Sequence, residues 1–198
     1  MKKIDFYRHS INARDIERVD RILRSIFLTT GKETATFEQN FSHYIGLKHT
    51  IGLTSCTAAL HLSLIALGIG RGDEVITTPM SFCATANSIL HAGAKPVFVD
   101  VEEETGNMNA GLIEAAITEN TKAIMPVHLY GQMCDMKNIK KIADKYNLRI
   151  IEDAAHAIEA SRGGVRVGQL SDTVCFSFYA TKNITSGEGG AVSTDNET

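Results

Sequence analysis

Residues 122–153, KAIMPVHLYGQMCDMKNIKKIADKYNLRIIED, contain a strand, a helix and a second strand in succession. The segments 122–127 and 148–153 are short and rich in apolar residues, whereas 135–147 repeats apolar side chains at helical spacing. A strand that is followed by a helix and another strand is typical of a parallel sheet whose faces are covered by helices. This unit therefore predicts the fold class.

The same alternation recurs along most of the chain. Most of the strand segments are apolar throughout, as are the central strands of a sheet that is covered on both faces. The sequence therefore predicts an α/β fold with three layers, in which a mostly parallel sheet is sandwiched by helices. The other segments of this pattern are strands at 49–54, 73–78 and 95–100 and helices at 58–69, 82–93 and 110–117.

Both ends of the chain depart from this alternation. Segments 173–178 and 189–194 read as strands with only a loop between them, which predicts a hairpin-like pairing or one antiparallel strand. Before the sheet, the apolar spacing at 13–25 and 34–46 predicts two amphipathic helices. The sequence stops at STDNET, directly after a strand, and leaves open whether the chain is a fragment and is active alone.

The composition bounds the class of protein and its partners. With 198 residues, 43% of them hydrophobic and 22% charged, the chain resembles an ordinary soluble domain. The formal net charge is −3, and the 20 lysines and arginines are scattered, so we expect no nucleic-acid or membrane partner and favour small molecules. No apolar run approaches the length of a membrane span, and we expect a cytoplasmic protein.

The cysteines and histidines give no sign of a disulfide framework or a metal centre. Cys56, Cys83, Cys134 and Cys175 are widely spaced, lie in or beside apolar segments and form no C-x-x-C pair. Buried free thiols are therefore favoured over disulfides. The seven histidines are dispersed, so the sequence predicts no metal.

Ligands of open α/β sheets bind beyond the carboxyl ends of the strands, so residues that follow a strand are the candidates for a site. The segment TSCTAAL, 54–60, follows a strand and begins a helix, where free amide groups favour a phosphate. Helix capping by serine or threonine is the alternative. Lys182, in FSFYATKN, follows another apolar run, and its amine can attack a carbonyl; a lysine in a solvated turn is the alternative.

Four further side chains follow strands. Asp153 ends an apolar strand and either pairs with a cationic group or caps a helix, and His156 would share a helical face with it. Ser177 can donate to an anion, although serines are common in strands. Phe82 can stack on a flat ring, although a core phenylalanine is the usual interpretation.

The segment PVHLYGQ, 126–132, adds His128 and Tyr130 after a strand, with core or loop packing as the ordinary interpretation. None of these candidates decides the function alone. In combination, a phosphate-binding helix start, an aromatic ring, an aspartate and a lysine after the strands of one sheet are what pyridoxal 5′-phosphate requires.

The chain resembles the DegT/StrS-type sugar aminotransferases, a family of fold-type I pyridoxal phosphate enzymes, over nearly all of its length. The resemblance implies an aspartate aminotransferase-like large domain over 46–198, lead-in helices over 1–45, and a C-terminal small domain that this chain lacks. It also implies a homodimer with active sites at the subunit interface. The motifs that carry it are LTTGKETATFEQNF, TSCTAALHLSL, GDEVITTPMSFCATANSI, GAKPVFVDV, PVHLYGQMCDM, IIEDAAHA and CFSFYATKNITSGEGGAV, in the family's order.

The resemblance implies a role for each candidate. Lys182 resembles the lysine that binds the cofactor covalently and transfers protons, and Asp153 the catalytic partner of the ring nitrogen. Phe82 matches the residue that stacks on the ring, and His156 falls near the ring's phenolic oxygen. The positions that resemble phosphate-binding residues are Thr57, Ala58 and Ser177.

Two positions depart from the family pattern. Cys56 stands where the family usually has glycine, so we expect a tighter phosphate turn or an altered backbone angle. SIFLTTG, 25–31, replaces a more usual glycine-aromatic pair near the substrate.

The function that the resemblance implies is transfer of an amino group from an amino acid, glutamate by expectation, to a nucleotide-linked keto-sugar in amino-sugar and surface polysaccharide biosynthesis. Lys182 argues against the family's dehydrating relatives, which have histidine there. The alternative is a non-catalytic or regulatory member that binds pyridoxal phosphate or a sugar nucleotide. A nucleotide-binding protein without this cofactor is disfavoured, because the chain has neither G-x-G-x-x-G after its first strand nor G-x-x-x-x-G-K-[ST].

Overall fold

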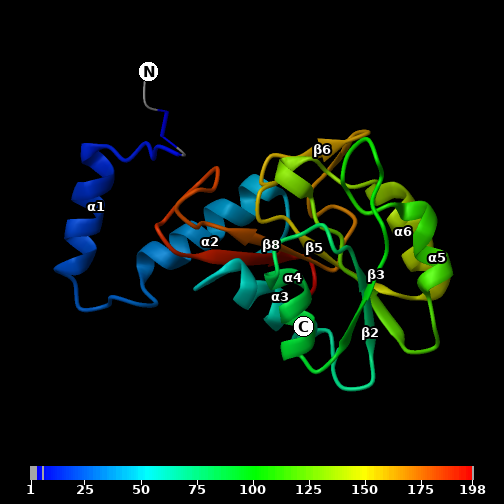
Figure 1. The fold of residues 1–198 in the computed structure, drawn as a ribbon. Helices are drawn as coiled ribbons and strands as arrows, with labels where there is room; N and C mark the ends of the chain where they lie inside the picture. The colour runs from blue at the N-terminus through cyan, green and yellow to red at the C-terminus, as the bar shows by residue number, and fades with distance from the viewer. Residues whose placement is uncertain (1–3, 6, 198) are drawn as a thin grey trace.

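The computed structural model describes residues 4–5 and 7–197, whose course is shown in Figure 1. The main sheet of this part of the chain contains β1 (His49–Leu53), β2 (Glu74–Thr77), β3 (Lys95–Phe98), β4 (Thr121–Ile124), β5 (Arg149–Asp153), β8 (Thr173–Ser177) and β9 (Gly190–Thr194). Their order across the sheet is β1-β9-β8-β5-β4-β2-β3. Neighbouring strands run parallel except at β9, which is antiparallel to β1 and β8. The predicted mostly parallel sheet is confirmed.

The last two strands pair as the sequence predicts. Ser177 of β8 lies opposite Gly190 of β9, and Gly190 in turn lies opposite Leu53 of β1. Since β9 is reversed between two strands of equal direction, its first residue lies at the edge where the other strands end. The loop that carries Lys182 therefore returns to the carboxyl edge of the sheet.

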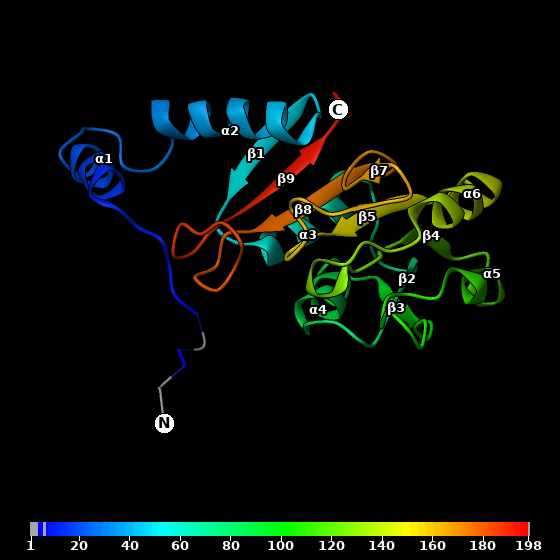
Figure 2. The same cartoon turned by 90° about the horizontal axis from the view of Figure 1, so that it is seen from above.

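Helices cover both faces of the sheet (Figures 1 and 2). Successive strand residues point to opposite faces, so Ile150 packs in a cluster with residues of one helix layer and Ile151 in a cluster with residues of the other. Helices α3 (Cys56–Ala66) and α4 (Ala84–His91) form one layer; α5 (Ile113–Ala116) and α6 (Met136–Tyr146) contribute to the other. The predicted three-layer arrangement is confirmed.

The two N-terminal helices differ in how they are placed. Helix α2 (Lys32–Ile45) packs Phe41 and Ile45 against aromatic and aliphatic side chains of β8 and β9, including Phe176. Helix α1 (Ala13–Leu23) has a capping box at Asn12 but no buried residue, and it lies apart from the sheet in Figure 1. Both predicted amphipathic helices are present, and of these two helices α2 contributes described residues to the core whereas α1 does not.

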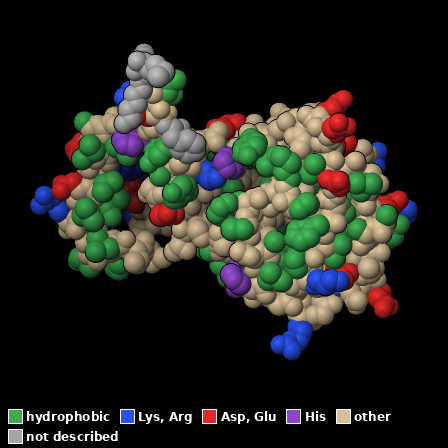
Figure 3. Space-filling model, in the orientation of Figure 1, with side chains coloured by type: hydrophobic (Ala, Val, Ile, Leu, Met, Phe, Trp, Pro, Cys, Tyr) green, Lys and Arg blue, Asp and Glu red, His purple; other side chains and the backbone are tan. Residues whose placement is uncertain are grey.

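The apolar stripe of α1 faces outward. Ile16, Val19 and Leu23 are all exposed, and hydrophobic side chains gather on this part of the surface in Figure 3. The helix is tied to α2 through an ion pair in which Arg18 lies 2.6 Å from Glu33. A surface pair of this kind contributes little stability, so α1 is held mainly by its chain connection.

Two features were not predicted correctly. The sequence did not indicate the short hairpin of β6 (Ser161–Arg162) and β7 (Val165–Arg166). Cys83 was expected to be a buried thiol, and this expectation is wrong: all four cysteines are free, but Cys83 is exposed because it lies in the loop that leads into α4 at the sheet edge. In the described residues, no helix is long and apolar enough to cross a membrane.

Candidate active site

The candidate residues lie at one edge of the sheet, where β1, β2, β4, β5 and β8 end and β9 begins. Ser55 to Ala58 follow β1, Phe82 follows β2, Asp153 ends β5 and Ser177 ends β8. This edge is where ligands bind in open α/β sheets. The local pattern of strands and helices thus brings residues from distant parts of the sequence to one place.

Lys182 is half-buried and lies against His156. Its Nζ is 2.5 Å from His156 Nε2. Partial burial lowers the pKa of Lys182, whereas the Asp153 carboxylate acts in the opposite direction. Partial burial, followed by the charge of Lys182, lowers the pKa of His156, so the neutral imidazole accepts a hydrogen bond from the lysine. Lys182 lies in a bend after β8, as the alternative interpretation expected, but its side chain is partly buried and in contact with His156.

Asp153 is buried, and both of its carboxylate oxygens accept hydrogen bonds. Thr85 Oγ1 donates to Oδ2 at 2.8 Å, and the Ala155 amide donates to Oδ1 at 3.2 Å. Sequence reasoning missed Thr85. The available signal was a polar residue that shares a helical face with Ser88 and Ile89, both of which are buried.

The first turn of α3 lies against Gly190, the strand neighbour of Ser177. Amide groups in this turn have no acceptor within the helix. Ser55 Oγ accepts from the Ala58 amide at 3.1 Å, so Ser55 is the cap and Ala58 is engaged within the protein. Within the described residues, the Thr57 amide donates to no acceptor, so its N–H group is free to bind a ligand.

Gly190 allows the start of α3 to lie directly on β9. A Cβ atom at this position would be 2.3 Å from the carbonyl carbon of Ser55 and 2.5 Å from the amide nitrogen of Cys56. Backbone atoms do not yield at such distances. A glycine between Leu53 and Ser177 in the sheet is therefore required for Ser177 and the helix start to lie close together.

We predict that Gly190→Ala displaces the start of α3. The free energy of unfolding should fall by about 1–3 kcal/mol, as in other overpacked sites, and inorganic phosphate should bind more weakly. Urea unfolding and calorimetric titration would measure the two effects. Gly52→Ala is the matched control on β1, because its Cβ would meet side-chain atoms only at 3.6 Å. Equal behaviour of the two variants would contradict the prediction.

Two aromatic rings stand at the open side of the site. Phe82 is 77% exposed, so the alternative of a core phenylalanine is wrong and its ring is free to stack on a ligand. Tyr130 is also exposed, and its ring lies edge-on to His156 with 6.2 Å between ring centroids. The loop approaches this closely because Gly131 has a φ of 88° and a Cβ there would be 2.9 Å from the His156 carbonyl oxygen.

Cys56 does not distort the phosphate turn. It is the first residue of α3, has no left-handed backbone angle, and buries its side chain among residues of α3 and Cys175. Burial raises the pKa of the Cys56 thiol, which keeps it neutral. The expected change of backbone angle is therefore wrong: the side chain points into the core.

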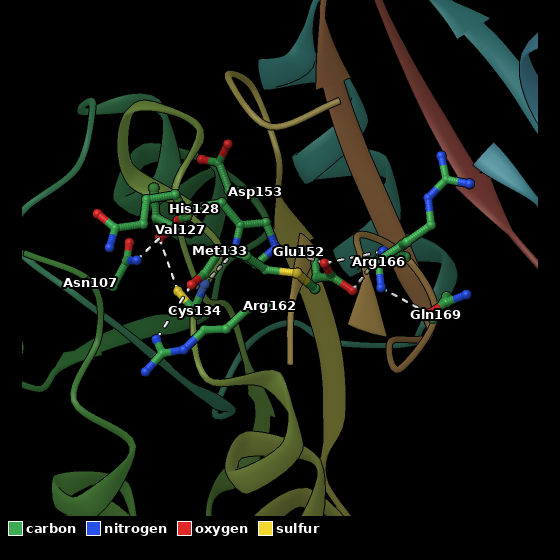
Figure 4. Close-up of polar contacts among 12 residues, drawn as sticks. Asn107, Val127, His128, Met133, Cys134, Glu152, Asp153, Arg162, Arg166 and Gln169 are labelled. Atoms are coloured by element: carbon green, nitrogen blue, oxygen red, sulfur yellow. Dashed lines mark hydrogen bonds and ion pairs between the residues drawn. The ribbon is translucent and has the colours of Figure 1, made fainter. Parts of the chain in front are cut away.

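His128 is buried and lies beside Glu152 (Figure 4). The side chain of Glu152 points to the face of β5 opposite to that of its neighbour Asp153. His128 Nε2 is 2.6 Å from Glu152 Oε2, and the Gly168 amide also donates to this carboxylate. Burial lowers the pKa of His128, while the neighbouring Glu152 carboxylate raises it. The Cys134 amide decides the ring's state, because it donates to Nδ1 and so places the single proton of a neutral ring on Nε2.

We expect Glu152→Ala to destabilise the fold strongly. It leaves the buried N–H groups of His128 and Gly168 without an acceptor, so the free energy of unfolding should fall by about 3 kcal/mol or more. Urea unfolding monitored by circular dichroism would measure the change. Glu103→Ala, at an exposed carboxylate, is the control, and a loss no larger than in this control would refute the structural role.

The residues at the carboxyl edge fit pyridoxal phosphate. Lys182 supplies an amine that is partly withdrawn from water, and Asp153 supplies a buried carboxylate for a ring cation. The Thr57 amide and the Ser177 hydroxyl are groups that can donate to a phosphate, and Phe82 exposes a ring. In the described residues, no group of three histidine, cysteine or acidic side chains could hold a metal ion.

Comparison with known proteins defines the relatives of this chain. Uncharacterized protein MJ1066 of Methanocaldococcus jannaschii is 56% identical over 96% of the chain and 50% of its own length. GDP-perosamine synthase of Caulobacter vibrioides is 48% identical over 85% of the chain and 46% of its own length. The chain therefore spans about half the length of these relatives.

A solved structure shows the same fold. The putative sugar aminotransferase Spr1654 from Streptococcus pneumoniae, in its PMP form, matches 99% of the chain and 53% of its own chain with a TM-score of 0.95 and 36% identity. The fold of this protein is thus the aminotransferase-like α/β fold that the sequence predicts. The model of the DegT/DnrJ/EryC1/StrS aminotransferase family matches residues 9–198, and the chain belongs to this family.

Proposed function

We propose that the full-length protein is a pyridoxal phosphate-dependent aminotransferase that moves an amino group from an amino acid to a nucleotide-linked keto-sugar. The observation that carries this proposal is the half-buried Lys182 amine in contact with His156 and within the field of the buried Asp153 carboxylate. A relative named GDP-perosamine synthase supports a nucleotide-sugar substrate. Glutamate as the donor, and a role in amino-sugar and surface polysaccharide biosynthesis, complete the proposal.

Each site residue has a chemical task in this proposal. Lys182 would hold the cofactor covalently through Nζ, and its free amine would accept and return the proton of the donor's α-carbon. His156 Nε2 accepts a hydrogen bond from Nζ and so directs its lone pair and protons. Asp153 favours a proton on the ring nitrogen because an adjacent anion stabilises a cation. When bound, pyridoxal phosphate supplies an electron sink for the charge that develops at the α-carbon.

The remaining residues bind and orient. Thr57 and Ser177 would hold the phosphate at the start of α3, with Ala58 beside them, and Phe82 would stack on the ring. In the overall reaction, the donor becomes an α-keto acid and the keto-sugar becomes an amino sugar.

The same proposal includes the organisation and location of the protein. It comprises a lead-in over 1–45, a large domain over 46–198, a homodimer and a cytoplasmic location. Sedimentation analysis would test the dimer.

Covalent capture of the cofactor tests the proposed function. Pyridoxal phosphate is added to the full-length protein, capture is followed by absorbance, and borohydride reduction then fixes the cofactor to one peptide, which should contain Lys182. Capture requires the neutral amine, so its rate constant should rise with pH. Because the pKa of Lys182 is lowered, the pH at which the rate is half-maximal should lie below 10.5, the ordinary pKa of a lysine. A colourless protein, or label on surface lysines only, would favour the non-catalytic alternative.

A further inference from the structure

Thr85 holds the Asp153 carboxylate from the first turn of α4, on the opposite side from the Ala155 amide. We propose that Thr85 is a positioning residue, which fixes the plane of this carboxylate so that it can meet the ring nitrogen of the cofactor. The inference rests on the proposed function and deepens it. It assigns a role to a residue whose side-chain hydroxyl donates a hydrogen bond to Asp153.

Asp153 is fixed along its whole length. Its backbone amide donates to the Pro126 carbonyl at 2.9 Å, and its carbonyl accepts from the His128 amide at 3.1 Å. Its side chain has two torsions, and the second of them, χ2, is the rotation of the carboxylate. Since Thr85 and Ala155 each bind a different oxygen, this rotation is restricted, and each oxygen keeps a lone pair for a ligand.

Thr85 is itself rigidly placed. It is fully buried, its amide donates to the Phe82 carbonyl at 3.1 Å, and its carbonyl accepts from Ser88 Oγ at 2.8 Å. A β-branched side chain in a helix has few rotamers, so little entropy is lost in holding this position. The same turn therefore connects Phe82, the proposed ring platform, to Asp153, the proposed partner of the ring nitrogen.

A neutral donor is suited to this position. The titratable groups that act electrostatically with Asp153 are Cys56 of α3, Cys175 of β8, His156 and Lys182. Burial raises the pKa of both thiols, so they carry no charge. A second cation in place of the hydroxyl would compete with the ring for the carboxylate, whereas a threonine orients it and leaves its charge in place.

The test compares three substitutions with a matched control in the full-length protein. Thr85→Val removes the hydroxyl at constant shape, Thr85→Ala removes it and creates space, and Thr85→Ser retains it. The control is Thr77→Val, at another fully buried threonine, whose hydroxyl donates to the Met125 carbonyl at 2.9 Å and not to Asp153. Each protein is loaded with pyridoxal phosphate that carries 15N in its ring.

The 15N chemical shift of the ring nitrogen is the decisive measurement, because a merely structural role would not change it. We expect wild type, Thr85→Ser and Thr77→Val to show the shift of a protonated nitrogen. Thr85→Val and Thr85→Ala should move toward the unprotonated value. Their kcat should fall about tenfold, as for loss of one hydrogen bond to a charged group, with less than a twofold change in KM for the amino donor.

The outcomes separate this inference from the proposed function. If wild type captures no cofactor at Lys182, the proposed function fails and the inference fails with it. If wild type captures the cofactor but Thr85→Val and Thr85→Ala keep its 15N shift and kcat, only the inference is overturned. Should Thr85→Val not fold, Thr85→Ala against Thr85→Ser gives the same comparison. An equal fall of kcat in Thr77→Val would also overturn the inference, since it would indicate a general packing effect.

Discussion

Lys182→Ala should abolish covalent capture of pyridoxal phosphate and reduce amino transfer by about 10⁴-fold, the upper range for loss of a general acid and base. The reason is that Lys182 supplies both the attacking amine and the proton carrier, and its Nζ is the group that contacts His156. Borohydride labelling with peptide mapping would measure capture, and single-turnover kinetics with glutamate would measure proton transfer.

Two further variants sharpen this result. Lys182→Arg keeps a cation but not a nucleophilic amine, because a guanidinium does not lose its proton near neutral pH. It should therefore be as inactive as Lys182→Ala. Lys141→Ala, at an exposed lysine of α6, should behave as wild type. Substantial activity in Lys182→Ala would remove the basis of the proposed function.

Asp153→Ala should slow turnover by about 10²–10³-fold, the usual loss when one preorganised electrostatic group is removed. Its effect on cofactor binding should be smaller, because Lys182, Phe82 and the phosphate site would remain. Steady-state kinetics and equilibrium dialysis of the cofactor would measure the two effects separately. Glu119→Gln, at an exposed carboxylate near the opposite edge of the sheet, is the control.

The same variant has a second, independent signature in its pH profile. Asp153 raises the pKa of Lys182, since a nearby anion favours the ammonium form. When this anion is removed, the amine loses its proton at a lower pH. In Asp153→Ala, the pH at which cofactor capture reaches half its maximal rate should therefore be lower than in wild type. A higher pH would show that Asp153 and Lys182 do not interact as described.

The positions of the candidate site residues at one edge of the sheet were predictable because they depend on local pattern. Asp153, Ser177 and Phe82 each follow a strand, and parallel strands end at one edge, so they had to share that edge. The exposure of Phe82 and Cys83 was not predictable in the same way. An apolar residue in a loop reads as core until the packing of α4 against the sheet is known, and here that loop lies at the surface.

The sequence by itself determined the three-layer α/β fold, the reversed last strand and the sheet edge that carries Lys182, because apolar periodicity and the succession of strands and helices along the chain are local features. Only the tertiary structure decided which side chains meet. Thr85 and Asp153 are 68 residues apart, and their hydrogen bond depends on how the first turn of α4 is placed relative to the end of β5. The start of α3 reaches Gly190 only through the register of β1, β9 and β8. Contacts of this kind follow from the packing of distant segments at ångström scale, which no local pattern of residues specifies.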